Sequence, residues 1–321
     1  SGFEAALDRQ RAQSQEERKG RKLGVAADEL GDLSKWEGAA GDAAGRFVGY
    51  DAVEIETEVA AVRRLEDGRV AVLLRETPFY AESGGQVSDR GEIVGDGWKV
   101  TVDDVRKVDG RNAAVGRLEG SLKFGAARAR VPGDRRRETE RNHTATHLLH
   151  AALRTVLGEH VHQAGSLVAP DRLRFDFTHH GPVKPEQLAE IEAMVNAEVW
   201  KATPVGTREM AYPEAVGSGA MALFGEKYGD VVRVVSIPGF SMELCGGTHV
   251  RNTSEIGVFR IVSESGVAAG VRRIEAVTAR GAYELARQRE RTLQQVADVL
   301  KAPADQLPKR VGALVEERRA L

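Results

Sequence analysis

Between residues 52 and 131, apolar side chains recur at every second position, in short runs separated by glycines. The runs are AVEIETEVAAV, GRVAVLLRE, GEIVGD, WKVTVDDVRKV and AAVGRLEG. A period of two is typical of strands that bury one face, and short strands with glycine turns favour a small antiparallel barrel. We therefore predict a β-barrel over 46–131.

The chain that follows changes to a helical period. A long amphipathic helix is predicted over 132–158, because Pro132 precedes it, Gly158 ends it and its apolar residues share one face. Two strand-like runs come next, then a second amphipathic helix over 184–202, then further strands on both sides of residue 245. Helices mixed with strands in this way indicate an α+β domain.

The two ends differ from this centre. Residues 3–22 show a polar helical pattern with a thin apolar stripe, and 37–49 is rich in Gly and Ala, as linkers are. After Gly281 the sequence is a charged helical arm with a coiled-coil-like texture. We predict an α+β protein in four parts: an N-terminal helical segment and linker (1–45), the barrel (46–131), an α+β domain (132–280) and the arm (281–321).

Composition narrows the class of protein. A chain of 321 residues exceeds what one hydrophobic core usually organises. The 46 Lys and Arg against 48 Asp and Glu give no global reason to expect nucleic acid, although local clusters can still bind it. No run approaches the roughly 18 apolar residues of a membrane span, so no membrane partner is expected. One cysteine fits a reducing compartment, which predicts a cytoplasmic location.

The single cysteine belongs to a candidate metal site. Cys245 and His249 are four residues apart, and Gly246-Gly247 lets the backbone turn between them. His143 and His147 have the same spacing on the first long helix, where it puts both imidazoles on one face. Each pair alone is a weak signal. Together they give a set of one sulfur and three nitrogen ligands that suits Zn2+.

Other histidines offer alternatives. HTATH is similar to the HExxH of metallopeptidases, but Thr144 stands where the glutamate base would be, which argues against a peptidase. The remaining histidines fit ordinary strand, helix and loop positions, with His162 as the first alternative ligand: His150, His160, His162, His179 and His180.

Six stretches, in the same order and without large gaps, resemble the editing domain of alanyl-tRNA synthetase: RNHTATHLLHAAL, QAGSLV, LRFDF, GAMALFGEKYGD, CGGTHV and GVFRIVSESGVAAGVRRIEAVT. Upstream, TPFYAESGGQVSDRGEI resembles the small barrel before that domain, which free-standing alanyl-tRNA editing proteins also contain. Threonyl-tRNA synthetase has a related domain, but GAMALFGEKYGD and the barrel favour the alanyl branch. The class II motifs of the aminoacylation core are absent from this sequence. The helical start at Gly2 and the arm after Gly281 resemble the flanking parts of the full synthetase, so we expect a central fragment rather than a free-standing editor.

The resemblance implies an activity: hydrolysis of the ester in Ser-tRNA(Ala) and Gly-tRNA(Ala), the products of mistaken charging. Binding alone rejects a missing methylene by only about 10–200-fold, so a second site is needed. The resemblance assigns Gln163, Thr146 and Ser166 to the pocket and, with Cys245, to the catalytic site. Without the resemblance, Thr146 would be interpreted as an ordinary helix-face residue and Gln163 as a strand-end amide. Four protein ligands suggest a structural ion, but a single thiolate leaves Zn2+ able to polarise an ester carbonyl. We prefer direct involvement of the ion.

For tRNA, an arginine-rich stretch lies just before His143, and its expected phosphate contacts are Arg135, Arg136 and Arg137. A solvated helix start, with Asp134 among the arginines, is the simpler alternative. Arg272 and Arg273 match the GVRRIEA part of the editing-domain motif and are expected near the terminal nucleotides of the tRNA. Gly84 and Gly85 are expected near the substrate end, although a plain hairpin turn would look the same.

Two other readings of the sequence predict different proteins. A zinc-stabilised RNA-binding module would bind tRNA without hydrolysing it. A coiled-coil assembly piece would associate through the region after residue 281, which also makes an oligomeric parent protein an expectation.

Overall fold

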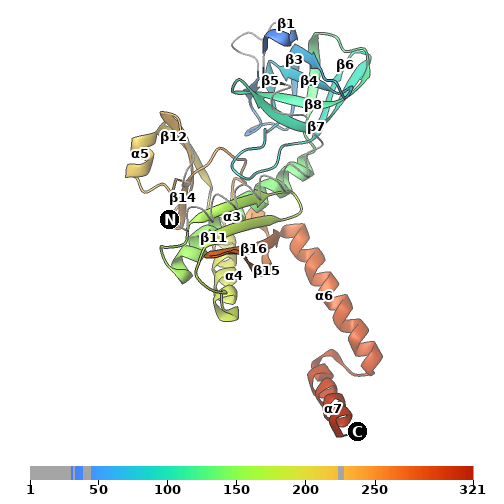
Figure 1. Ribbon diagram of the computed structural model, residues 1–321, viewed down its shortest axis with the longest axis vertical. Helices are drawn as coiled ribbons and strands as arrows, with labels where there is room; N and C mark the ends of the chain where they lie inside the picture. Colours follow the sequence, from blue (N-terminus) through green and yellow to red (C-terminus); the bar gives the residue numbers. More distant parts are fainter. Residues whose placement is uncertain (1–29, 32, 39–44, 223–227, 321) are drawn as a thin grey trace. The chain divides into compact units, whose positions relative to one another are not determined.

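The computed structural model describes residues 30–31, 33–38, 45–222 and 228–320, and the predicted helix over 3–22 lies outside them. The chain divides into two compact units, Ser1–Thr278 and Ala279–Leu321, each of which is described by itself (Figure 1). The predicted α+β class is confirmed. No described helix is long and apolar enough to cross a membrane.

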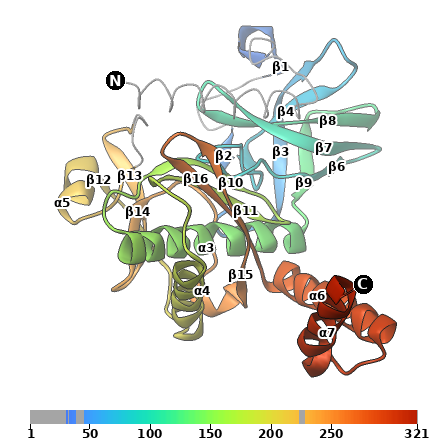
Figure 2. The same ribbon diagram turned by 60° about the horizontal axis from the view of Figure 1, so that its bottom comes forward.

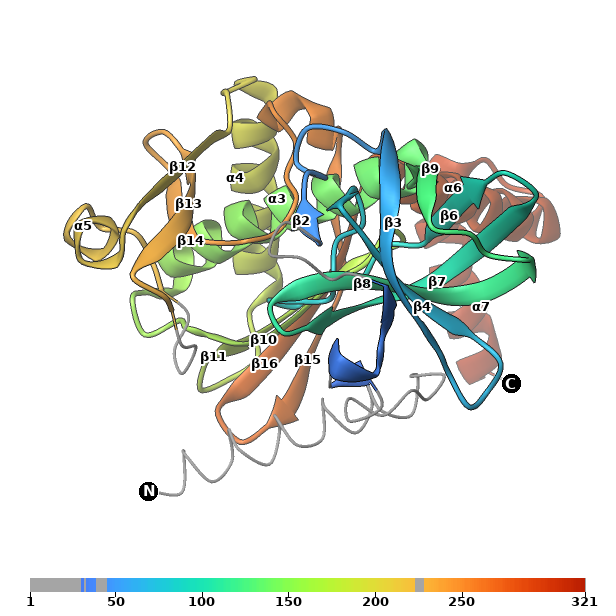
Figure 3. The same ribbon diagram turned by 90° about the horizontal axis from the view of Figure 1, so that it is seen from above.

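The first part of the larger unit is a closed antiparallel barrel of six strands (Figure 3). The order β3-β4-β8-β7-β6-β9 is closed by pairing of β9 with β3. Short accessory pieces flank it: η1 (Leu33–Lys35), β1 (Glu37–Gly38), β2 (Arg46–Phe47) and β5 (Glu76–Thr77). The barrel strands are β3 (Glu54–Arg64), β4 (Val70–Leu74), β6 (Gly91–Gly95), β7 (Trp98–Val108), β8 (Arg111–Gly120) and β9 (Gly125–Arg130).

Alternating burial in the barrel strands explains the period seen in the sequence. Along β7, Trp98, Val100 and Val102 are buried at every second position. A register shift between Val102 and Asp104 then moves the buried face to Val105. A β-bulge adds one residue to one strand, and that extra residue is why strict alternation fails here without loss of the core.

The second part packs two helices on a four-stranded antiparallel sheet of order β10-β11-β16-β15 (Figure 2). The predicted helices over 132–158 and 184–202 are confirmed as α3 (Gly133–Leu157) and α4 (Pro185–Trp200). The core joins Leu148 and Leu149 of α3 to Phe175 of β11 and Ile274 of β16. The sheet strands are β10 (Gln163–Val168), β11 (Leu173–Thr178), β15 (Phe259–Ala268) and β16 (Val271–Thr278).

A smaller sheet leads the chain to its cysteine. Its order is β12 (Gly206–Ala211), β13 (Val231–Ile237) and β14 (Ser241–Leu244), and α5 (Tyr212–Gly217) packs beside it. Because β14 ends at Leu244, Cys245 is the first residue beyond the strand. The turn 245–250 then runs to η2 (Thr253–Ile256).

The smaller unit is the helical arm. It contains α6 (Ala279–Leu300), η3 (Ala304–Gln306) and α7 (Leu307–Ala320), and α6 and α7 pack on each other. The domain limits 45/46, 131/132 and 280/281 stay predictions, as does association through the arm.

Candidate metal centre

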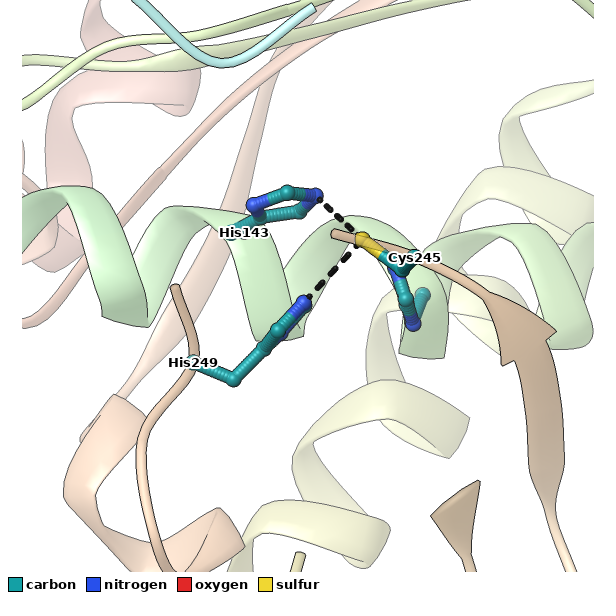
Figure 4. Close-up of side chains that lie close together, drawn as sticks. His143, Cys245 and His249 are labelled. Atoms are coloured by element: carbon teal, nitrogen blue, oxygen red, sulfur yellow. Dashed lines mark hydrogen bonds between the residues drawn. The ribbon is translucent and has the colours of Figure 1, made fainter. Parts of the chain in front are cut away.

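The four predicted ligands lie together. The ligand atoms of His143, His147, Cys245 and His249 are all within 4.8 Å of one another. Cys245 Sγ is 3.4 Å from His143 Nε2 and 3.3 Å from His249 Nε2 (Figure 4). His143 and His147, both on α3, are at most 5% exposed. The one thiol of the chain therefore lies against imidazole nitrogens that come from a helix and from a turn.

The hydrogen bond on the far side of His143 determines its tautomer. His143 Nδ1 is 2.7 Å from Gln86 Oε1, which also accepts from the backbone N–H of Thr248 at 2.9 Å. An amide oxygen can only accept, so Nδ1 carries the proton. His143 Nε2 then keeps its lone pair for a metal, on the side of Cys245.

His249 is oriented in the same way by a threonine. Thr144 Oγ1 donates to the backbone oxygen of Glu140 at 3.0 Å, which leaves its lone pairs as acceptors. They accept from His249 Nδ1 at 3.1 Å and from the N–H of Val250 at 3.2 Å. His249 Nε2 is therefore the unprotonated nitrogen. Thr144, which occupies the glutamate position of a peptidase motif, here orients a ligand of the cluster.

A buried carboxylate, that of Glu243, lies beside His147 and His150. Glu243 of β14 is 5% exposed; its Oε1 is 3.2 Å from His150 Nδ1 and its Oε2 3.9 Å from His147 Nε2. Burial raises the pKa of Glu243, but the neighbouring His147, His150 and Ser241 outweigh burial and leave that pKa lowered. Sequence reasoning missed Glu243; the signal was a charged residue inside the apolar strand that precedes the cysteine.

The electrostatics of the cluster keep its histidines neutral. Burial, with nearby positive groups, lowers the pKa of His143 and His249 well below the ordinary value and also lowers the pKa of His147. Neutral imidazole is the form that binds a metal. Three neutral imidazoles and one thiol at these distances therefore fit a divalent transition metal.

The turn that carries Cys245 is held from two sides. Tyr50 OH donates to the backbone oxygen of Gly246 at 2.6 Å. Arg233 donates to the backbone oxygens of Cys245 and Gly247, each at 2.9 Å, and its guanidinium lies 4.1 Å from the centre of the Tyr50 ring. Sequence reasoning missed both residues, because nothing local in the sequence connects residue 50 to residue 246.

The predicted pocket residues lie on neighbouring elements. Thr146 on α3 and Ser166 on β10 are each 4% exposed, Gln163 at the start of β10 is half-buried, and α3 packs against β10. Thr146 Oγ1 donates to the backbone oxygen of Asn142 at 2.8 Å, as helical threonines often do. Gly84 and Gly85 have positive φ angles, and a Cβ on Gly85 would lie 2.8 Å from the backbone oxygen of Ser166.

The prediction that Arg136 contacts phosphate needs correction. Its side chain is 1% exposed, pairs with Asp89 at 2.5 Å, and donates to the backbone oxygens of Gly49 and Pro78. A guanidinium fully occupied in the interior cannot reach a phosphate. Pattern reasoning failed because consecutive helical arginines point in different directions.

The other predicted arginines differ in accessibility. Arg137 is about half exposed and pairs with Glu255, while Arg135 is half-buried. On the sheet, Arg273 forms a two-pronged pair with Asp176 at 2.7 and 2.9 Å, and Arg272 pairs with Glu264 at 2.5 Å. These pairs hold the two side chains in fixed positions on β16, an inner strand of the four-stranded sheet.

Comparisons with known proteins give the class first. Residues 232–275 match the family described as the threonyl and alanyl tRNA synthetase second additional domain, and residues 1–133 match the class II (A) tRNA synthetases. These two segments are therefore similar to class II aminoacyl-tRNA synthetases. The matched segment 232–275 contains Cys245 and His249 and follows α3, which carries His143 and His147.

Within that class, the chain is similar to the alanine–tRNA ligases. It is 46% identical to the alanine–tRNA ligase of Listeria welshimeri over 99% of its length, and 48% identical to that of Bordetella pertussis over 100%. The enzyme of Chlorobaculum tepidum is 46% identical over 100% of the chain. The chain spans 37% of the length of each of these relatives. The predicted resemblance is confirmed.

Proposed function

We propose that this chain hydrolyses the ester bond of Ser-tRNA(Ala) and Gly-tRNA(Ala), as the editing part of an alanine–tRNA ligase. The observation that carries the proposal is the cluster of three neutral imidazoles and one thiol, two of whose members, Cys245 and His249, lie in the segment that matches the second additional domain of the threonyl and alanyl synthetases. Water adds to the carbonyl carbon of the ester, and the bond from that carbon to the tRNA oxygen breaks. The products are the free amino acid and the tRNA with its 3′-terminal hydroxyl restored.

The cluster is proposed to hold Zn2+, with His143, His147, Cys245 and His249 as ligands. Bound there, Zn2+ would supply Lewis-acid polarisation of the ester. The chain's own residues do the rest: Gln86 and Thr144 fix two imidazole tautomers, and Arg233 fixes the turn. We expect metal analysis to find about one zinc per chain, because one set of four ligands binds one ion.

Selectivity is proposed to reside in Gln163, Thr146 and Ser166. A buried polar group that pairs with the serine hydroxyl is left unpaired by the methyl of alanine, which costs about 1–3 kcal/mol. These residues lie on α3, which also carries His143 and His147, and on β10, which packs against α3.

The partner is proposed to be the aminoacylated 3′ end of tRNA(Ala). Its expected contacts are Arg135, Arg137, Arg272 and Arg273, with Gly84 and Gly85 beside the substrate end. The role implies a cytoplasmic location, where tRNA is charged. Sedimentation of the chain with and without residues 281–321 tests whether the arm drives association.

One assay tests the function directly. The purified chain is incubated with Ser-tRNA(Ala), Gly-tRNA(Ala) and Ala-tRNA(Ala), and release of each amino acid is followed. We expect serine and glycine to be released and alanine to be retained. Binding of tRNA(Ala) without release of serine would instead favour an RNA-binding module without activity.

A pair of threonine variants tests the pocket. Thr146→Phe is expected to abolish serine release, because the added ring would block the proposed pocket, and to leave the metal content unchanged, because Thr146 is not one of the four predicted ligands. Thr155→Phe is the matched control, since Thr155 is exposed on the same helix and makes the same bond to the carbonyl four residues earlier. Equal deacylation by Thr146→Phe and the wild type would place the pocket elsewhere.

A further inference from the structure

We infer that the barrel supplies a positioning residue to the metal centre: Gln86 holds His143 in the tautomer and orientation in which it binds a metal. This inference rests on the metal site of the proposed function. Gln86 belongs to the barrel's turn 83–87 and lies 57 residues before His143 in the chain. Its side chain is 0% exposed.

Every polar atom of the Gln86 side chain is used at the centre. Oε1 accepts from His143 Nδ1 at 2.7 Å and from the N–H of Thr248 at 2.9 Å. Nε2 donates to Thr248 Oγ1 at 2.9 Å. One side chain is therefore bonded both to a ligand on α3 and to the turn that carries the other two ligands, Cys245 and His249.

The backbone around Gln86 is fixed in place by the neighbouring strand. Val168 of β10 donates its N–H to Gly85 O at 2.8 Å and accepts from the N–H of Val87 at 3.0 Å. These bonds pin the residues on each side of Gln86 to the domain that holds the cluster. The amide therefore reaches His143 from a rigid support.

A glycine in the ligand turn leaves room for this contact. A Cβ on Gly247 would collide with the imidazole of His143 and lie 2.8 Å from Gln86 Oε1. Gly247 is thus required by the close approach of Gln86 and His143, a reason beyond the flexibility of the turn. The barrel residue and the ligand turn fit each other around one imidazole.

The physical consequence concerns metal affinity. A hydrogen bond on the far nitrogen of a metal-binding imidazole fixes its tautomer and raises its basicity, and its loss typically lowers affinity by about 10–100-fold. A role in packing alone would have a different signature, because an apolar side chain of similar size would fill the space equally well.

Two substitutions of Gln86 distinguish a positioning role from a packing role, because the two roles predict opposite rankings of the metal affinities of the variants. We would measure Co2+ and Zn2+ dissociation constants by chelator competition, and record the visible absorption of bound Co2+. If Gln86 positions His143, Gln86→Leu weakens binding by about 10–100-fold and changes the Co2+ spectrum, while Gln86→Glu binds at least as tightly as the wild type. If Gln86 only fills space, Gln86→Leu matches the wild type and Gln86→Glu is the damaged variant.

Controls separate this inference from the function on which it rests. Asn112→Leu removes another buried barrel amide, one that donates to Phe79 O and is expected to leave the Co2+ affinity unchanged. Absence of Co2+ and Zn2+ binding by the wild type would contradict the metal centre itself. Wild-type binding together with an unchanged Gln86→Leu overturns only the role of Gln86. If Gln86→Leu does not fold, weaker binding by folded Gln86→Glu overturns it instead.

Discussion

At the scale of single residues, Cys245 differs from the other members of the cluster because it alone can bring a negative charge to a bound cation. His143 is buried, His249 is partly buried and both are neutral; their Nε2 atoms lie within 3.4 Å of its sulfur. A site made of imidazoles alone leaves the charge of the ion uncompensated. In the proposed metal site the thiolate would therefore set the affinity, and the hydrogen bonds that His143 and His249 donate to Gln86 and Thr144 would set the geometry.

We expect Cys245→Ala to remain folded, to bind tRNA, to lose its zinc and to hydrolyse Ser-tRNA(Ala) far more slowly. The core around α3 and α4 does not include Cys245, so its packing is unaffected. Circular dichroism, metal analysis and the deacylation assay check this, with His162→Ala as the control outside the cluster. Full activity of Cys245→Ala would contradict an active role of zinc, and global unfolding would favour a structural one.

The buried histidines also predict a pH dependence of stability in the metal-free protein. Burial lowers the pKa of His143 and His249 below the ordinary 6.5. Below about pH 6.5 the unfolded chain binds protons that the folded chain does not, so the free energy of unfolding falls as the pH drops. Urea midpoints at about pH 7.5 and 5.5 measure this. The difference should shrink in His249→Gln, in which all other titrating groups are retained; an unchanged difference would contradict the buried histidines as its cause.

At the scale of elements, the turn 83–87 of the barrel does more than connect strands. Its residues bond to Val168 on β10, and Gly85 lies against Ser166. The turn therefore contacts Ser166, a predicted pocket residue, and also supplies Gln86 to the cluster. A hairpin turn exposed to solvent would need neither contact.

Alanine variants of two neighbouring glycines distinguish the effect of backbone strain from the effect of the contact between Gly85 and Ser166. Gly84 has φ +58°, and a Cβ on it would have no atom within 4 Å, whereas Gly85 has φ +89° and its Cβ would lie 2.8 Å from Ser166 O. Both alanine variants bear the strain of a positive φ, but only Gly85→Ala displaces β10. We expect Gly85→Ala to lose much more deacylation activity than Gly84→Ala, as measured by kcat/KM for Ser-tRNA(Ala). Equal losses would mean that strain alone matters.

At the scale of the larger unit, Arg136 joins its two parts. The helix α3 starts directly after the last barrel strand, and Arg136 in its first turn bonds to Asp89, Gly49 and Pro78 of the barrel side. The guanidinium and the carboxylate are both almost completely buried. The pair therefore fixes the end of α3 to the barrel that supplies Gln86.

Two adjacent arginines test this attachment. Arg136→Met leaves Asp89 buried without its partner, which should lower the free energy of unfolding by about 3–5 kcal/mol. Arg137→Met breaks an exposed pair with Glu255 and should cost at most about 1 kcal/mol, while weakening tRNA binding. Urea denaturation and tRNA titration of both variants check the contrast. Similar stability losses for the two would contradict the assignment of Arg136 to the interior.

The sequence by itself determined the elements and the four ligands of the cluster, because both depend on short-range spacing. A period of two gave the barrel, helical periodicity gave α3 and α4, and the i, i+4 pairs identified His143, His147, Cys245 and His249. Tertiary structure alone decided which distant residues support them. Gln86, Tyr50 and Arg233 reach the ligand turn from far along the chain, and Arg136 turns inward although its neighbour Arg137 faces solvent. Contacts of this kind depend on how sheets and helices pack, and no local period in a sequence records that packing.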